Sequence, residues 1–226
     1  ARSLLGFASH LIVFLQSQIV PREIFFATFL YMADAKLVMQ LREQTGAGIL
    51  DAKNALEESG DDLMKAAELL RKKGAVKAAS KSDRETHEGV IHAYIHAGGK
   101  VGAMVEVLCE TDFVARNEQF QDFVHGIAMH VAAANPLYLK PEDVPEEVVE
   151  KEKEIIKEQM AGENKPANVV EKIVEGKMNK YFQETCLLKQ AFVKDDSVTI
   201  EELVKSQIAK IGENIQVKRF SRFSLM

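Results

Sequence analysis

The chain has 226 residues, of which 46% are apolar, and it carries a formal net charge of −5 at pH 7. This composition suits one large or two smaller domains with a substantial core, and it excludes a disordered chain. The net acidic charge, with a pI near 5.8, argues against a protein whose main task is to coat nucleic acid and favours a protein partner or a small substrate.

Residues 1–32 form an apolar opening segment for which several interpretations stay open. Its apolar runs are broken at His10, at residues 16–18 and at residues 21–23, so no stretch reaches the roughly 18 residues of a membrane span. The segment resembles a weak signal-like pattern, whereas an organelle presequence usually carries more arginine and serine. We favour a third interpretation, in which Met32 is the initiator and the preceding residues are translated from upstream sequence.

Residues 33–86 predict a domain of three short helices. Apolar residues recur at helical spacing on both sides of a glycine-containing turn at residues 45–48. Asp61 or Asp62 can cap the third helix, because either side chain accepts hydrogen bonds from first-turn N–H groups. The set resembles a three-helix bundle of the ubiquitin-associated type, whose small core leaves a helical face free to bind a partner.

A polar segment over residues 71–88 is predicted to connect this bundle to the rest of the chain. It is rich in lysine and arginine at first and turns acidic from Asp83 on. We interpret it as a solvated linker whose first basic residues favour the negative end of the preceding helix. A direct contact of these basic residues with an acidic partner stays open as the alternative.

A β-hairpin is predicted next. Residues 89–96 alternate apolar and polar side chains, a Gly-Gly pair provides the turn, and residues 101–108 return as a more continuous apolar strand. His92 and His96 fall on one face of the first strand, because side chains alternate with period two. No third ligand of suitable spacing stands nearby, so we favour an ordinary strand face and predict no metal site.

The chain then predicts a long helix and a helical hairpin. The helix over residues 118–134 carries an apolar stripe and ends at Asn135, which is followed by proline. Two further helices of similar length, joined by a turn rich in glycine and proline, predict an antiparallel hairpin over residues 144–184.

The last elements are a helix over residues 199–211, with Ser197 or Thr199 as its cap, and a strand over residues 214–223. Residues 87–226 are therefore predicted to form an α+β core with a small antiparallel sheet and the helical hairpin. Together with the N-terminal bundle, this makes the predicted fold class α+β.

Residues 111–114, TDFV, stand where an apolar strand gives way to a helix. Thr111 or Asp112 can cap that helix, with Phe113 tucked onto the core. The alternative presents the carboxylate and the aromatic ring outward, toward a partner. Spacing alone favours the capping interpretation, because helix caps are commoner than functional wedges.

No catalytic constellation stands out along the chain. Residues 45–53 superficially suggest a phosphate loop, but they lack the Gly-Lys-Ser/Thr ending and lie between two helices. Cys109 and Cys186 have no CxxC spacing, which predicts buried, inert thiols in a reducing cytosol. We therefore expect a protein that acts by binding, with no cofactor and no metal, and not an enzyme.

Three segments together resemble elongation factor Ts: residues 41–81, 111–117 and 209–220. They occur in the family's order, and the likeness covers about residues 33–225 without a large gap. The chain has one strand–turn–strand unit with one TDFV run. This resembles the short form of the family, which has a single core half where longer members carry two.

The resemblance implies a guanine-nucleotide exchange factor that binds GDP-bound elongation factor Tu, disturbs its magnesium site and promotes GDP release. The residues implied to bind this partner are Thr111, Asp112, Phe113 and Val114 at the magnesium site and, in the N-terminal bundle, Leu41, Arg42, Thr45, Gly46, Ala47 and Gly48. Because the short form lacks the second core half, we also expect a homodimer formed through the terminal strand or the helical hairpin.

The implied setting is the cytoplasm, with no direct contact to nucleic acid or membrane. An organelle is the alternative if residues 1–31 are a genuine presequence. A rival function is that of a ubiquitin-associated-like adaptor, which would tether proteins without changing nucleotide kinetics. Nucleotide-release kinetics separate the adaptor from the exchange factor.

Overall fold

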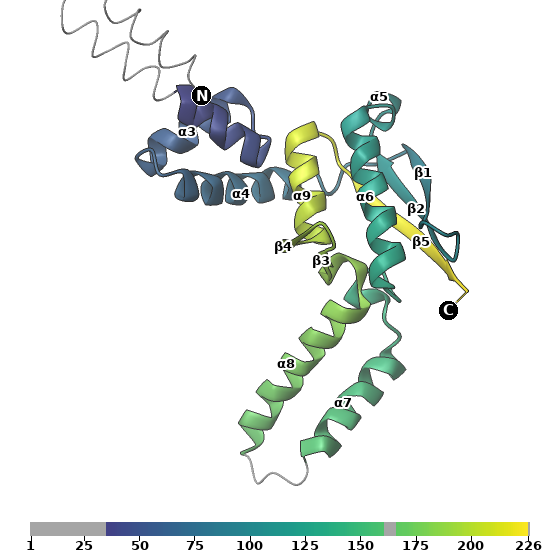
Figure 1. Cartoon of the computed structure of the whole chain (residues 1–226). Helices are drawn as coiled ribbons and strands as arrows, with labels where there is room; N and C mark the ends of the chain where they lie inside the picture. Colours follow the sequence, from purple (N-terminus) through teal and green to yellow (C-terminus); the bar gives the residue numbers. More distant parts are fainter. Residues whose placement is uncertain (1–34, 161–165, 226) are drawn as a thin grey trace, which may run out of the picture. The chain divides into compact units, whose positions relative to one another are not determined.

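The computed structural model describes residues 35–160 and 166–225 (Figure 1). The interpretations offered for residues 1–32 therefore concern residues outside the described ranges. Contacts between Cα atoms divide the chain into two compact units, the first ending at Lys72 and the second beginning at Lys73. The domain ranges 33–86 and 87–226 stay predictions. Within the described ranges, no helix is long and apolar enough to cross a membrane.

The first unit contains the predicted helices: residues 35–45, α3 (Ile49–Ser59) and the first part of α4 (Leu63–Ala79). Its small core consists of Leu41, Ala52, Ala55, Leu56 and Ala66. Of the two predicted caps of the third helix, Asp62 is the one used. Its Oδ1 accepts the backbone N–H groups of Met64 and Lys65 at 3.0 and 3.1 Å.

The prediction of a solvated linker over residues 71–88 is wrong for its first part. Helix α4 continues to Ala79, and the side chain of Ala78 is buried in the core of the second unit. Gly74 permits this packing, because a Cβ at that position would stand 3.3 Å from the Cβ of Ala209. Alanine and lysine are good helix formers, so the composition that suggested a linker also suits a helix.

A three-stranded antiparallel sheet lies in the second unit: β1 (Glu88–Ile95), β2 (Val101–Cys109) and β5 (Gln216–Ser224), in the order β1-β2-β5. The predicted hairpin is confirmed, with Glu88 opposite Cys109 and Ile95 opposite Gly102. The inward residues of the central strand β2 are buried: Ala103, Val105, Val107 and Cys109. These residues belong to the main core, which explains why every second position of β2 is apolar.

Helix α6 (Glu118–Ala134) packs against one face of this sheet (Figure 1). Asn117 begins the helix by accepting the N–H of Gln119 at 2.8 Å, and Asn135 ends it in the left-handed region at φ 51°. The predicted apolar stripe is confirmed as buried: Phe120, Phe123, Val124, Ile127, Ala128 and Val131. This stripe and the inward residues of β2 make up much of the main core.

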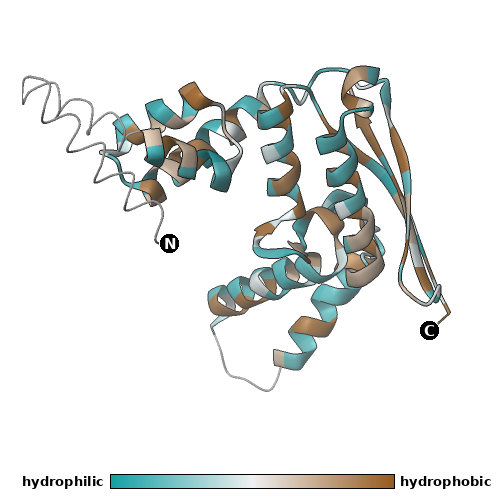
Figure 2. Cartoon of the chain, turned by 45° about the horizontal axis from the view of Figure 1, so that its top comes forward, coloured by the Kyte–Doolittle hydropathy of each residue, from teal (hydrophilic) through white to brown (hydrophobic). Residues whose placement is uncertain are grey.

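Helices α7 (Glu146–Met160) and α8 (Ala167–Thr185) form the predicted helical hairpin, preceded by the 3-10 helix η1 (Pro141–Asp143). Both helices are largely hydrophilic, with apolar residues recurring at intervals (Figure 2). Those apolar residues meet in a separate small core of Ile156, Met160, Val174 and Met178. Residues at helical spacing thus bury one face and leave the other charged.

The chain next forms η2 (Leu187–Lys189), β3 (Ala191–Phe192), β4 (Asp195–Thr199) and α9 (Ile200–Ile211). The β3–β4 sheet was not predicted, because such short strands give no period-two pattern and β4 begins with two aspartates. Helix α9 was predicted. Thr199, and not Ser197, caps it in a capping box with Glu202.

His130 is a buried titratable residue of α6. Its Nε2–H donates to Gln190 Oε1 at 3.0 Å, and its Nδ1 accepts the N–H of Val193 at 3.2 Å. Burial lowers the pKa of His130 below its usual value of 6.5. The unfolded chain therefore takes up this proton near pH 6.5 and the folded chain only at lower pH, so acid favours unfolding.

We expect the free energy of unfolding to fall as the pH drops below about 6.5, with His130 contributing up to about 1.4 kcal/mol per pH unit. Urea denaturation followed by circular dichroism at each pH measures this. His130→Gln keeps a donor and an acceptor but does not titrate, so its pH dependence should be weaker. Equal pH dependence in the two proteins would contradict the assignment.

Candidate functional site

The four-residue helix α5 (Asp112–Ala115) makes the corner between β2 and α6. Thr111 caps α5: its backbone is extended, and its Oγ1 accepts the N–H of Val114 at 3.4 Å. Of the two predicted caps, Thr111 and Asp112, Thr111 is therefore the one used. A single helical turn is not stable on its own, so α5 depends on the groups that hold its ends.

Phe113 projects from α5 into solvent, with 89% of its surface exposed. The interpretation that tucks this ring onto the core is wrong, because its neighbours take the inward positions. Val114 packs against the main core, and Ala115 is buried. An exposed ring contributes little to folding stability, so its removal can test binding without disturbing the fold.

Asp112 lies beside Phe113 and is paired with Arg116, one helical turn further on. Asp112 Oδ1 accepts a hydrogen bond from Arg116 Nε at 3.1 Å, and Asp112 Oδ2 lies 2.8 Å from Arg116 Nη2. Both side chains are more than half exposed, so the pair is screened by water and contributes little to stability. Arg116 was not predicted as part of the site, although its four-residue spacing from Asp112 could have indicated the pair.

Thr111 is also held from outside α5, by Glu213. Its N–H and its hydroxyl donate to the two carboxylate oxygens of Glu213 at 3.0 and 2.7 Å. The buried thiol of Cys109 lies close by and donates to the Thr111 carbonyl at 3.3 Å. Burial, together with the charge of Glu213, raises the pKa of Cys109 to about 11, so this thiol stays protonated and unreactive.

The second candidate group, residues 41–48, belongs to the first unit and lies at the turn before α3. The Thr45 hydroxyl donates to the Leu41 carbonyl at 2.7 Å. Arg42 Nε donates to the Ala47 carbonyl at 3.2 Å. These bonds hold the turn in one conformation.

The predicted residues of this turn differ in exposure and conformation. Leu41 is fully buried in the core of the first unit, so its part in any binding is indirect. Arg42, Thr45 and Ala47 are half-buried, and Gly46 and Gly48 are exposed. Gly46 has φ 67°, which favours glycine, whereas Gly48 has φ −63° and an extended backbone that any residue can adopt.

Exposed apolar side chains next to this turn were missed. Ile49 and Leu50 are 62% and 70% exposed at the start of α3. Met39 and Met64, in the same unit, are also exposed. Adjacent residues of a helix cannot both face a narrow core, so the Ile49-Leu50 pair was a signal that at least one of them faces solvent.

The histidines of the hairpin make pairwise contacts. His92 Nε2 lies 3.0 Å from His125 Nδ1, and His96 Nδ1 lies 3.1 Å from the hydroxyl of Tyr94. Burial and the nearby His125 lower the pKa of His92. Among the residues that the structure describes, no group of three histidines, cysteines or acids is placed to hold a metal ion.

Comparison with known proteins agrees with the motifs. The family model for elongation factor Ts matches residues 28–207. Elongation factor Ts of Carboxydothermus hydrogenoformans is 54% identical over 86% of this chain and 89% of its own length. Elongation factor Ts of Thermosipho melanesiensis is 55% identical over 86% of this chain and 99% of its own length.

The α+β fold and these matches define a translation elongation factor with a role in protein biosynthesis. More narrowly, the chain belongs to the elongation factor Ts family. The match to nearly the full length of the Thermosipho protein agrees with the short form that the sequence resembles.

Proposed function

We propose that the chain is a guanine-nucleotide exchange factor for elongation factor Tu. It binds the GDP-bound GTPase, inserts the Asp112–Phe113 corner beside the magnesium and phosphate site, and promotes GDP release. The observation that carries this proposal is the 89% exposure of Phe113 on a corner whose neighbouring residues are anchored. The backbone that carries the ring is thus held in place before the partner arrives.

The physical basis is reciprocal coupling between two ligands of one partner. If this chain and Mg·GDP each weaken the other's hold on elongation factor Tu, then binding of the chain must lower the affinity for GDP and so favour its loss. A chain that bound the GDP-bound and nucleotide-free states equally would change nothing. Typical couplings are about 1–3 kcal/mol, and an exchange factor needs at least that much.

Each residue of the corner has a distinct role in this proposal. Phe113 is the wedge, because an aromatic ring supplies a large apolar area at a low cost in rotamer entropy. Asp112 can leave its exposed pairing with Arg116 and accept hydrogen bonds from the partner or perturb the magnesium hydration shell. Thr111 and Val114 hold the corner in shape.

The N-terminal bundle supplies a second contact to the nucleotide-binding domain of the partner. Residues 42–48 provide the turn, and Leu41 supports it from the core. Ile49 and Leu50 add exposed apolar surface directly beside the turn. An exposed aliphatic pair next to exposed backbone is suited to binding the surface of another protein.

The direct experiment loads elongation factor Tu with fluorescent GDP and measures its dissociation with and without this chain. An exchange factor speeds dissociation at substoichiometric amounts. The adaptor alternative, in which the bundle only tethers proteins, predicts binding with an unchanged dissociation rate. Binding without acceleration would therefore replace the exchange function with the adaptor.

We infer that the chain acts in the cytoplasm and has no catalytic chemistry or cofactor of its own. The thiols of Cys109 and Cys186 are free and buried, which suits a reducing compartment. Burial also raises the pKa of Cys186, so both thiols are protonated near neutral pH.

We also propose a homodimer that forms through the exposed face of the sheet that contains the terminal strand β5. Four large side chains on that face are exposed: Ile91, Ile95, Met104 and Phe223. The strand register puts them on the same side, because Ile95 and Phe223 both lie opposite Gly102. Covering this apolar surface with a second copy removes it from water.

Sedimentation equilibrium at micromolar concentration should show a dimer, and Phe223→Asp should shift the chain to a monomer. Ile155→Asp, on the exposed side of the helical hairpin, is the matched control and should stay dimeric. A dimer broken by Ile155→Asp instead would move the interface to the hairpin. A wild-type monomer would contradict the dimer altogether.

A further inference from the structure

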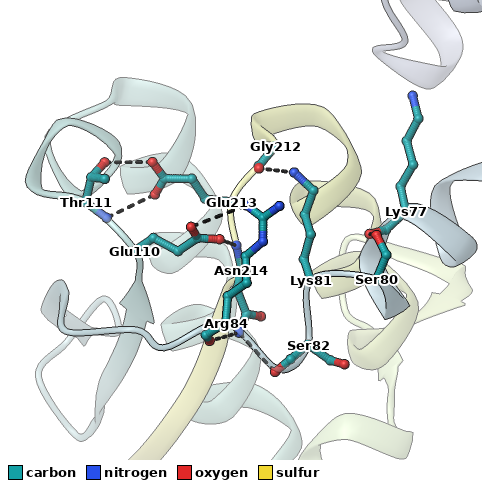
Figure 3. A network of polar contacts seen from close by, with 10 residues as sticks. All are labelled: Lys77, Ser80, Lys81, Ser82, Arg84, Glu110, Thr111, Gly212, Glu213 and Asn214. Atoms are coloured by element: carbon teal, nitrogen blue, oxygen red, sulfur yellow. Dashed lines mark hydrogen bonds and ion pairs between the residues drawn. The ribbon is translucent and has the colours of Figure 1, made fainter.

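The loop Gly212–Asn214, between α9 and β5, lies at the centre of a polar network (Figure 3). Its three residues contact two segments that are far away in the sequence. One is the corner at Glu110 and Thr111, and the other is the stretch over residues 81–84 that follows α4. The loop therefore joins the candidate site to another part of the same unit.

Glu213 binds Thr111 with both carboxylate oxygens. The Thr111 N–H donates to Oε2 at 3.0 Å and its hydroxyl donates to Oε1 at 2.7 Å. The hydroxyl has one proton. It donates that proton in the hydrogen bond to Glu213, so its oxygen is free to accept the hydrogen bond from the N–H of Val114. Glu213 thus orients the group that caps α5, and hydrogen bonds to a charged acceptor are the stronger kind.

Asn214 fixes the position of Glu213 from the other side. It is 1% exposed, and its N–H donates to Glu110 Oε1 at 2.6 Å. The side-chain nitrogen Nδ2 of Asn214 donates to the carbonyls of Ser82 and Arg84 at 3.2 and 2.7 Å. A buried amide with these bonds satisfied leaves the loop one well-defined conformation.

Two further contacts complete the anchorage. Lys81 donates to the Gly212 carbonyl, where α9 ends in the left-handed region at φ 89°. Arg84 lies 3.5 Å from Glu110, which is the acceptor of the Asn214 N–H. The acceptor carboxylate of Glu213 therefore stands on a loop that is tied at both neighbouring positions.

We propose that Glu213 is a positioning residue that holds the turn of α5 so that Phe113 points outward, an inference that rests on the proposed exchange function. The turn has only four residues and cannot order itself. Val114 and Ala115 anchor its inner side, and Glu213 anchors its start. Without Glu213, the ring samples several directions, and fewer encounters with the partner are productive.

The first test measures, in the free, full-length protein, how firmly Glu213 holds the start of α5. In Glu213→Ala, amide hydrogen exchange at Thr111 and Ala115 should become at least about tenfold faster, while the amides of α6 keep their protection. Glu213→Gln retains one acceptor oxygen and should fall between the two. Unchanged exchange at Thr111 in Glu213→Ala would overturn the positioning role of Glu213.

A matched control is available at the opposite end of α9. Glu201 also accepts from two partners, Lys189 at 2.8 Å and Lys205. Glu201→Gln removes a carboxylate from the first turn of α9 without touching the corner, so exchange at Thr111 should not change. Faster exchange at Thr111 in Glu201→Gln would mean a general loss of stability and would overturn the specific role of Glu213.

The second test measures release of fluorescent GDP from elongation factor Tu over a range of chain concentrations. Glu213→Ala should lower the maximum release rate roughly tenfold and change the half-saturating concentration much less, because the other contact surface is intact. In the Phe113→Ala background, adding Glu213→Ala should cause no further loss, because both changes remove the same action. Additive losses would overturn the positioning role.

The outcomes separate this inference from the function on which it rests. Slow release with Phe113→Ala but a wild-type rate with Glu213→Ala would overturn the positioning role alone. A wild-type rate with correctly folded Phe113→Ala would overturn the wedge function and the positioning role together. Slow release with both single variants, and no additivity in the double variant, supports both.

Discussion

Phe113→Ala is expected to slow the release of GDP from elongation factor Tu by about thirtyfold, because a central aromatic residue of an interface is commonly worth about 2 kcal/mol or more. The ring is 89% exposed, so the folded structure loses almost no packing when it is removed. Stopped-flow measurement of fluorescent GDP, with the chain in excess, records the effect as a single rate.

The control for this variant is Val193→Ala, which truncates another exposed apolar side chain of the same unit. Val193 is 51% exposed and lies outside the corner, so this variant should release GDP at the wild-type rate. A wild-type rate with Phe113→Ala, in a protein whose circular dichroism is unchanged, would remove the wedge assignment.

For Phe120→Ala, seven positions further along the chain, we expect a large loss of folding stability. Phe120 has 0% exposure and belongs to the buried stripe of α6. Truncating a buried phenylalanine leaves a cavity and typically costs about 3–5 kcal/mol of folding free energy. Urea denaturation should therefore show a large loss of stability, with the midpoint moved well below that of the wild-type chain.

Phe113→Ala serves as the matched comparison, since it makes the same chemical change on the surface. Its unfolding free energy should stay within about 0.5 kcal/mol of the wild-type value. The two phenylalanines thus separate folding from function. A loss from Phe113→Ala as large as that from Phe120→Ala would show that the exposed ring packs against something in solution.

Elements with long, regular patterns could be predicted from the sequence. The stripe of α6, the β1–β2 hairpin and the last helix each repeat an apolar period over several turns or pairs. Short or compositionally mixed elements could not. Strand β3 has two residues, and the end of α4 carries the lysines typical of a linker, so tertiary packing decides both.

The candidate site was predicted only in part, for a physical reason. The spacing of the TDFV run is compatible with a ring on the core and with a ring in solvent. Which direction Phe113 takes depends on Val114 and Ala115 filling the inward positions, which no local pattern encodes. The anchor Glu213 is 102 positions from Thr111, so only the folded chain brings the two together.

The same limit applies to the turn of the first unit. Leu41 shares the helical spacing of its neighbours, and the fold decides that it is buried while Ile49 and Leu50 are exposed. Motif resemblance marks a stretch of chain and does not separate the residues that touch a partner from those that support them. Exposure, read from the fold, makes that separation.

The proposed exchange function requires that this chain and Mg·GDP weaken each other's binding to elongation factor Tu. Calorimetric titration of the chain into nucleotide-free elongation factor Tu, and into the same protein saturated with Mg·GDP, measures that coupling directly. We expect the chain to bind the nucleotide-free form at least about tenfold more tightly. Equal affinity for the two forms would contradict it, because a ligand with no preference between two states cannot shift their populations.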